Sequence, residues 1–207
     1  MMIIKDIGGK VASIWEGMRP VTQNMLARAI RSGSSVSAAA PAAKTNYDAH
    51  ADWEVSGLLT ALDERSKSGD IRKDAAKLTE IEQVAKACVR LLESQSASAE
   101  VFIQLAERAL KANDYDHLDK LADRLSERFV VSEIAEIIRQ TDMPQIRAIA
   151  YETLAMMPLN AVTPLLDDPL YAGIAANSLE QKAYEFDSDE ARDILEQFDL
   201  ENDISSE

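Results

Sequence analysis

The spacing of apolar residues is the feature that most restricts the fold of this chain. From about residue 52 onward these residues recur at intervals of three and four, as in VSGLLTALDER (residues 55–65), which is the period of an amphipathic α-helix. Stretches rich in Ser, Gly, Asn and Asp separate such segments and predict helix ends. We find no sustained alternation of apolar and polar residues of the kind that a half-buried strand requires. The sequence therefore predicts an all-α protein. Its helices are expected within residues 3–18, 21–30, 55–65, 71–93, 102–110, 118–125, 134–138, 146–154, 162–166, 171–186 and 191–198.

Two of these segments carry the same pattern 25 residues apart. In each, an acid is followed at offsets of 4, 8 and 12 by an apolar residue, a small residue and a leucine: Asp142, Ile146, Ala150 and Leu154, then Asp167, Tyr171, Ala175 and Leu179. These offsets follow one face of a helix, and a small residue in the middle lets a neighbouring helix approach closely. We therefore expect stacked antiparallel helical hairpins that pack through Ala150 and Ala175.

This spacing resembles the second helix of HEAT and HEAT-like repeats, including those of the phycobilin-lyase type. The resemblance covers about residues 130–185 and extends more loosely over 52–130. The second copy departs from the pattern, because Ala172 stands where Arg147 stands in the first. The resemblance implies an α-solenoid whose concave face binds a partner, and it carries over no catalytic residue. An irregular bundle of stacked helical hairpins produces a similar pattern and is the alternative.

The first 31 residues form a separate, basic amphipathic segment. Gly8 and Gly9 each weaken a helix here by roughly 1 kcal/mol relative to Ala, so the segment needs a surface to lie against. That surface is expected to be a protein groove, another copy of the chain or the protein's own domain. The residues predicted to bind it form one apolar stripe: Ile3, Ile4, Ile7, Val11, Ile14, Trp15 and Met18.

Composition divides the chain into four expected parts. They are an amphipathic helical segment (1–31), a flexible linker rich in Ser and Ala (32–51), a helical-repeat domain (52–198) and an acidic tail (199–207). The last 21 residues hold nine acids and one Arg. They predict a final amphipathic helix followed by a solvated tail, and the alternative is a short docking peptide anchored by Phe198, Leu200 and Ile204.

Charge argues against a nucleic-acid partner. The formal net charge is −14, and residues 1–50 carry six basic and three acidic side chains, so residues 51–207 carry −17. A surface of this sign repels phosphates on average. A HEAT-repeat enzyme acting on DNA is therefore disfavoured.

The residue types that support catalysis or metal binding are sparse. Cys88 is the one cysteine, which excludes an internal disulfide and fits a reducing compartment; its place in an apolar helical pattern predicts a buried thiol. His50 and His117 are 67 residues apart, so they offer no metal-ligand spacing. The acids around His117 in NDYDHLD are expected to cap a helix. The Gly-Gly-Lys run at Lys10 and the acidic run DSDEARD (187–193) lack the residues of a nucleotide loop and of a calcium loop. We expect no metal, no cofactor and no enzymatic activity.

The leading hypothesis is a non-enzymatic, cytoplasmic protein–protein interaction module or adaptor. It would bind a partner through the helical-repeat surface and through the stripe of residues 3–18. One alternative places residues 3–31 on an anionic membrane surface, with Lys5, Lys10, Arg19, Arg28 and Arg31 near the headgroups. A second reads residues 17–44, which hold three Arg and no acid, as an organelle-targeting peptide. A third is a HEAT-like lyase-type enzyme.

Overall fold

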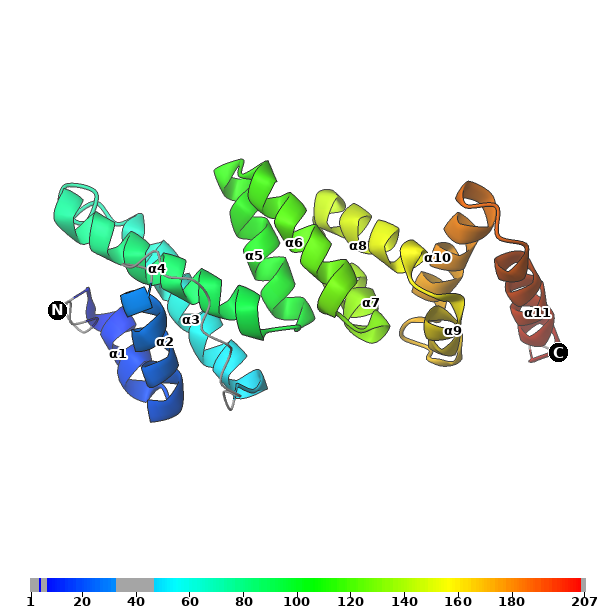
Figure 1. Cartoon of the computed structure of the whole chain (residues 1–207), viewed down its shortest axis with the longest axis horizontal. Helices are drawn as coiled ribbons and strands as arrows, with labels where there is room; N and C mark the ends of the chain where they lie inside the picture. The colour runs from blue at the N-terminus through cyan, green and yellow to red at the C-terminus, as the bar shows by residue number, and fades with distance from the viewer. Residues whose placement is uncertain (1–3, 5–6, 33–46, 206–207) are drawn as a thin grey trace. The chain divides into compact units, whose positions relative to one another are not determined.

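The all-α prediction is confirmed by a computed structural model, which describes residue 4, residues 7–32 and residues 47–205, with side chains up to residue 200. Helix follows helix in these residues, without a strand among them (Figure 1). The elements are α1 (Gly9–Gly17), α2 (Pro20–Ser32), α3 (Ala49–Ser66), α4 (Ala75–Gln95), α5 (Ala99–Ala112), α6 (Tyr115–Arg128), α7 (Val131–Gln140), α8 (Pro144–Met156), α9 (Leu159–Val162), the 3-10 helix η2 (Thr163–Asp167), α10 (Ala172–Glu185) and α11 (Asp189–Ser205).

The chain divides into two compact units, Met1–Ser96 and Ala97–Glu207. This division differs from the four expected parts, because α1 and α2 pack against α3 and α4 and share their core. Residues 33–46 of the expected linker lie outside the described residues, and its last three residues begin α3. The expected acidic tail is helical as far as Ser205, where α11 ends.

Helix α3 is the centre of the first unit. It contacts α1, α2 and α4, and its leucines Leu58, Leu59 and Leu62 are fully buried. The helix begins at a strong cap, since Asp48 accepts a hydrogen bond from the backbone N–H of Ala51 at 2.9 Å. Cys88 is buried in α4, as its sequence context predicts.

Two helices of the first unit begin later than the apolar pattern predicts. Helix α1 begins at Gly9 and not near residue 3, because Gly8 adopts a φ of 153° that a helix does not allow. A Cβ at Gly8 would lie 2.8 Å from Arg65 Nε, so any other residue here would both adopt an unfavourable φ and displace the Arg65 side chain. Helix α4 begins after Asp74, which caps it by accepting from the N–H of Lys77 at 3.1 Å.

The second unit consists of successive packed helices from α5 to α11. Helix α7 packs against α5 and α8, and α10 packs against α8 and α11. Asp114 accepts from the N–H of His117 at 3.1 Å and so caps α6, as predicted for the acids of this turn. Glu133, in the first turn of α7, accepts from the N–H of Ala99 at 2.7 Å and caps α5 from a neighbouring helix.

The repeated pattern falls on buried helix faces in both copies. The apolar and small residues of α8 and α10 at the matching offsets are fully buried, namely Ile146, Ala150, Leu154, Ala175 and Leu179. Tyr171 is half-buried, and its O–H donates to Glu136 Oε2 at 2.9 Å. These are packed helical pairs of a kind that a bundle and a solenoid share, and the HEAT-like assignment stays a prediction.

Enlarging the small residue of the first copy tests this packing. Ala150→Leu adds three carbon atoms to a fully buried position and should lower the free energy of unfolding by about 1–3 kcal/mol. Ala148→Leu, at an exposed position of the same helix, should change it by less than about 0.5 kcal/mol. Urea unfolding followed by far-ultraviolet circular dichroism measures both. Equal stability of the two variants would contradict close packing through Ala150.

Candidate functional site

The predicted partner-binding stripe lies mainly in the core of the first unit. Ile4, Ile7, Val11 and Met18 are at most 6% exposed, and α1 packs against α3. Ile14 and Trp15 are half-buried, while Ile3 lies outside the described residues. The structure therefore places the stripe against the chain's own domain, one of the three surfaces considered for it.

A buried carboxylate fastens α2 to α3. Glu54 of α3 is 3% exposed, and it accepts hydrogen bonds from the Arg19 backbone N–H at 2.6 Å, from Arg19 Nε at 3.2 Å and from the hydroxyl of the buried Thr22. Arg19 directly precedes α2, and Thr22 lies in its first turn. Glu54 therefore caps α2 from a different helix, where a negative charge also interacts favourably with the helix dipole.

Arg19 joins this carboxylate to a second one. Its guanidinium donates to both oxygens of Asp48, at 2.6 and 2.9 Å, and Asp48 in turn caps α3. Burial alone would raise the pKa of Glu54, but the hydrogen bonds from Thr22 and Arg19 outweigh it and lower that pKa. Arg19, followed by the Ala51 N–H, holds the pKa of Asp48 well below its usual range. All three groups are charged at neutral pH, so they hold the fold together and do not exchange protons there.

A second polar cluster ties the start of α3 to the end of α4. Asp52 accepts from the Tyr47 O–H at 2.6 Å and from the Ser96 O–H at 2.9 Å, and Ser96 is the residue that ends α4. Burial raises the pKa of Asp52 even though both hydrogen bonds act to lower it. Burial, with the neighbouring Asp52, also raises the pKa of Tyr47. The start of α3 is thus held to the end of α4 by side-chain contacts within the unit.

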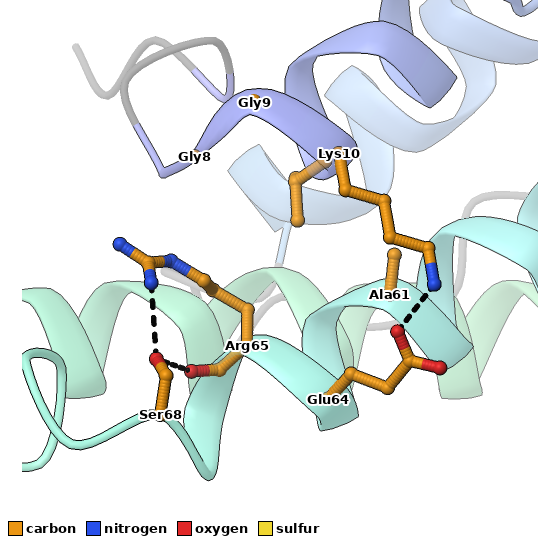
Figure 2. Close-up of a pocket in the computed structure, with 8 residues that line it drawn as sticks. Gly8, Gly9, Lys10, Ala61, Glu64, Arg65 and Ser68 are labelled. Atoms are coloured by element: carbon orange, nitrogen blue, oxygen red, sulfur yellow. Dashed lines mark hydrogen bonds and ion pairs between the residues drawn. The ribbon is translucent and has the colours of Figure 1, made fainter.

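A cavity of about 380 Å³ lies between the start of α1 and the end of α3 (Figure 2). Figure 2 shows Lys10 reaching from α1 to Glu64 of α3, with which it pairs. Arg65 donates from Nε to the Ile7 carbonyl at 2.9 Å and pairs with Asp70 at 2.7 Å. The Lys10–Glu64 pair joins α1 to α3, and the bond from Arg65 to the Ile7 carbonyl joins the residue stretch before α1 to α3. The cavity is lined by Gly8, Gly9, Lys10, Val11, Ala61, Glu64, Arg65 and Ser68.

The two histidines lie beside acids without forming a metal site. His50 Nε2 is 3.6 Å from Glu54 Oε1, and His117 Nδ1 is 3.9 Å from Asp114 Oδ2. In the part of the chain that the structure describes, no three His, Cys, Asp or Glu side chains are placed to hold one metal ion. No helix within residues 7–32 and 47–205 is both long and apolar enough to cross a bilayer.

Trp53 is a surface residue that the sequence analysis did not predict. It is 72% exposed, and its ring lies 5.7 Å from that of His50, between ring centroids. A signal was present in the sequence, because Trp53 falls on the side of α3 opposite the stripe of Leu58 and Leu62. The other exposed residues of this face are Ala49, His50, Thr60 and Glu64.

The docking peptide considered as an alternative for the C-terminal residues stays a prediction. Phe198 is half-buried, whereas Leu200 is 64% exposed on the opposite side of α11. The two therefore do not share one apolar stripe, and the side chain of Ile204 lies outside the described residues.

Comparison of the chain with models of protein families, with curated proteins and with solved structures gives no match.

Neutralising the buried carboxylate tests its role. Glu54→Gln should lower the free energy of unfolding at pH 7 by about 1–3 kcal/mol, because an amide cannot accept all the hydrogen bonds that the carboxylate accepts. Glu64→Gln, at the exposed pair with Lys10, should cost less than about 1 kcal/mol. The fluorescence of the two tryptophans, Trp15 and Trp53, both in the first unit, follows urea unfolding there.

The same variants give a pH test with a defined sign. The folded pKa of Glu54 lies below its unfolded value of 4.5. Its contribution to the free energy of unfolding is therefore complete above pH 4.5 and is lost as the pH falls through the folded pKa. The stability difference between the unaltered chain and Glu54→Gln should therefore shrink as the pH falls below 4.5. A difference that stays constant or grows on acidification would contradict the assignment.

Proposed function

We propose that the chain is a non-enzymatic protein interaction module that contacts its partner through the uncovered face of α3 around Trp53. The observation that carries this proposal is the 72% exposure of that tryptophan. Tryptophan is highly buried on average and is enriched among the residues that dominate binding energy at protein interfaces. Covering the exposed 72% of a side chain of about 200 Å² would contribute roughly 3–4 kcal/mol at about 25 cal/mol per Å².

The surroundings of Trp53 support a preformed contact site. Helix α3 is held by α1, α2 and α4, and the His50 ring lies against that of Trp53. One turn further on, a Cβ at Gly57 would meet no atom within 4 Å, so a partner side chain has room beside the tryptophan. A rigid aromatic side chain on a rigid helix loses little entropy when it binds.

The N-terminal helices contribute to this function indirectly. Their apolar stripe supplies part of the core that supports α3, and the contacts of Arg19 and Thr22 with Glu54 lie one residue from Trp53 in the sequence. The partner surface proposed for the chain is therefore on α3, and the stripe of residues 3–18 serves to hold α3 in place.

Site-specific crosslinking in the cells that produce the protein tests the proposal. A photoreactive phenylalanine analogue at position 53 should give a discrete crosslinked protein, whereas the same analogue at Tyr115, an aromatic residue with 59% exposure, should not. Once the partner is isolated, Trp53→Ala should weaken its binding at least about 30-fold without changing the stability of the chain, as for a residue worth 2 kcal/mol or more. Identical crosslinking at both positions, or unchanged affinity of the variant, would refute the proposal.

The membrane alternative makes a different prediction. Since most of the stripe is buried in the first unit, we expect no binding to vesicles of phosphatidylserine and phosphatidylcholine at physiological salt. The variant Arg28→Glu/Arg31→Glu reverses two exposed charges of α2 and should behave like the unaltered chain in vesicle sedimentation. If the unaltered chain sedimented with the vesicles and the variant did not, the result would support binding to a membrane surface instead.

A further inference from the structure

We propose that two copies of this chain pair through antiparallel α3 helices, so that Trp53 of each copy packs over Gly57 of the other. This inference rests on the proposed function, because it names the occupant of the surface around Trp53. It follows from three features of that surface: a projecting tryptophan, an open space at a helical glycine one turn further on, and a single exposed acid, which is already paired.

Gly57 is a residue that the packing of its own chain does not explain. It lies in the middle of α3, where glycine is less favourable for a helix than alanine. A Cβ at this position would meet no atom within 4 Å, so none of the helices around α3 requires the absence of a side chain. A glycine at an uncovered position lets another backbone or side chain approach the helix closely. Gly57 therefore fits a close contact with a group from outside the chain.

Trp53 has the shape that such a contact needs. Its side chain is 72% exposed, and its ring lies 5.7 Å from that of His50, between ring centroids, on the side of the helix start. Side chains of a helix lean toward its N-terminus, so the ring leaves the space at Gly57 open. One face of α3 thus carries a projecting group and an open space, one helical turn apart.

Two-fold symmetry satisfies both features at once. In an antiparallel pair of α3 helices with the symmetry axis beside residue 55, position 53 of each copy lies opposite position 57 of the other. Each tryptophan then fills the space at the glycine of the other copy, and the same contact is made twice. A different protein would have to supply both a space for Trp53 and a group to cover Gly57, whereas a second copy of the chain supplies both. This self-complementarity selects the occupant.

The distribution of charge allows two copies to meet at this face. Residues 1–96 carry 13 basic and 12 acidic side chains, and residues 97–207 carry 9 and 24, so repulsion between copies arises mainly from the second unit. The one exposed acid on the α3 face is Glu64, which pairs with Lys10. In this register Glu64 lies beyond the start of the other α3, which begins at Ala49. The pairing therefore brings no exposed acids of the two α3 helices together.

Self-association of the full chain is the first test. A contact of one helix on one helix is smaller than the roughly 1,200 Å² that stable interfaces bury, so the dimer should be weak and reversible. Sedimentation velocity at chain concentrations of about 1–300 µM should show a sedimentation coefficient that rises with concentration. Added salt should not weaken the dimer, because salt screens the repulsion between the acidic second units. A chain that stays monomeric at every concentration would overturn the proposal.

Two variants and a matched control locate the contact. Trp53→Ala removes the projecting group and Gly57→Leu fills the space, and each should weaken self-association about tenfold or more. Gly173→Leu, at a glycine of α10 where a Cβ also meets no atom within 4 Å, should weaken it by no more than about twofold. Circular dichroism should show that all three chains keep their helices. Equal effects of the two leucine substitutions would contradict packing over Gly57.

Mixing the two variants tests the symmetry of the pair. Trp53 of the Gly57→Leu chain meets the unaltered glycine of the Trp53→Ala chain, and the introduced leucine meets the introduced alanine. Both contacts then combine a large side chain with a small one, so the mixed pair should associate more tightly than either variant with itself. Fluorescence anisotropy, with one variant labelled and the other in excess, measures this difference. If mixing gave no gain in affinity, the proposed register would be wrong.

The crosslinking experiment at position 53 separates this inference from the proposed function. A product with twice the mass of the chain supports pairing with a second copy. A discrete product of any other mass would overturn the pairing and leave the interaction surface at Trp53 in place. Failure of the inference and failure of the proposed function are therefore distinguishable.

Discussion

The carboxylate of Glu54 is the contact on which the arrangement of the first unit depends. A buried charge is costly unless it is paired and hydrogen-bonded, and here Arg19 and Thr22 supply both. These partners come from the start of α2, so the carboxylate can be satisfied only when α2 lies against α3. Because Asp48 shares the same guanidinium, one arginine connects the caps of two helices. The N-terminal segment is in consequence part of a folded unit and supports the face of α3 that carries Trp53.

Helix positions could be predicted from the sequence because the apolar period and the helix caps are local signals. Asp48, Asp74 and Asp114 each cap the helix that follows them, and the small residue Ala150 lies in a packed face. The grouping of helices into units could not be predicted in the same way. It depends on contacts between residues far apart in the sequence, such as Arg19 with Glu54, and composition alone presented residues 1–31 as a separate part.

The candidate surfaces could be predicted only in part, because the sequence shows which residues are apolar but not what covers them. The stripe of residues 3–18 was correctly identified as apolar, but the surface that covers it is α3 for the residues the structure describes. Trp53 was not predicted to be a surface contact, because apolar periodicity identifies the residues that face the core and Trp53 lies on the opposite side of the helix. In α11 the apolar period was recognised, whereas the degree to which α10 covers it becomes visible only once the helices are packed. The surface proposed around Trp53 follows from this separation between core faces and outer faces.

Hydrogen exchange of the intact chain, read by mass spectrometry, tests most directly whether the N-terminal helices belong to the first unit. Amides of α2 bonded within the helix should exchange nearly as slowly as those of α3, since α2 is capped by Glu54 and packs against α3 and α4. Exchange of α2 at the rate of an unfolded peptide, with α3 and α4 still protected, would contradict the account and return residues 1–31 to the role of a free segment.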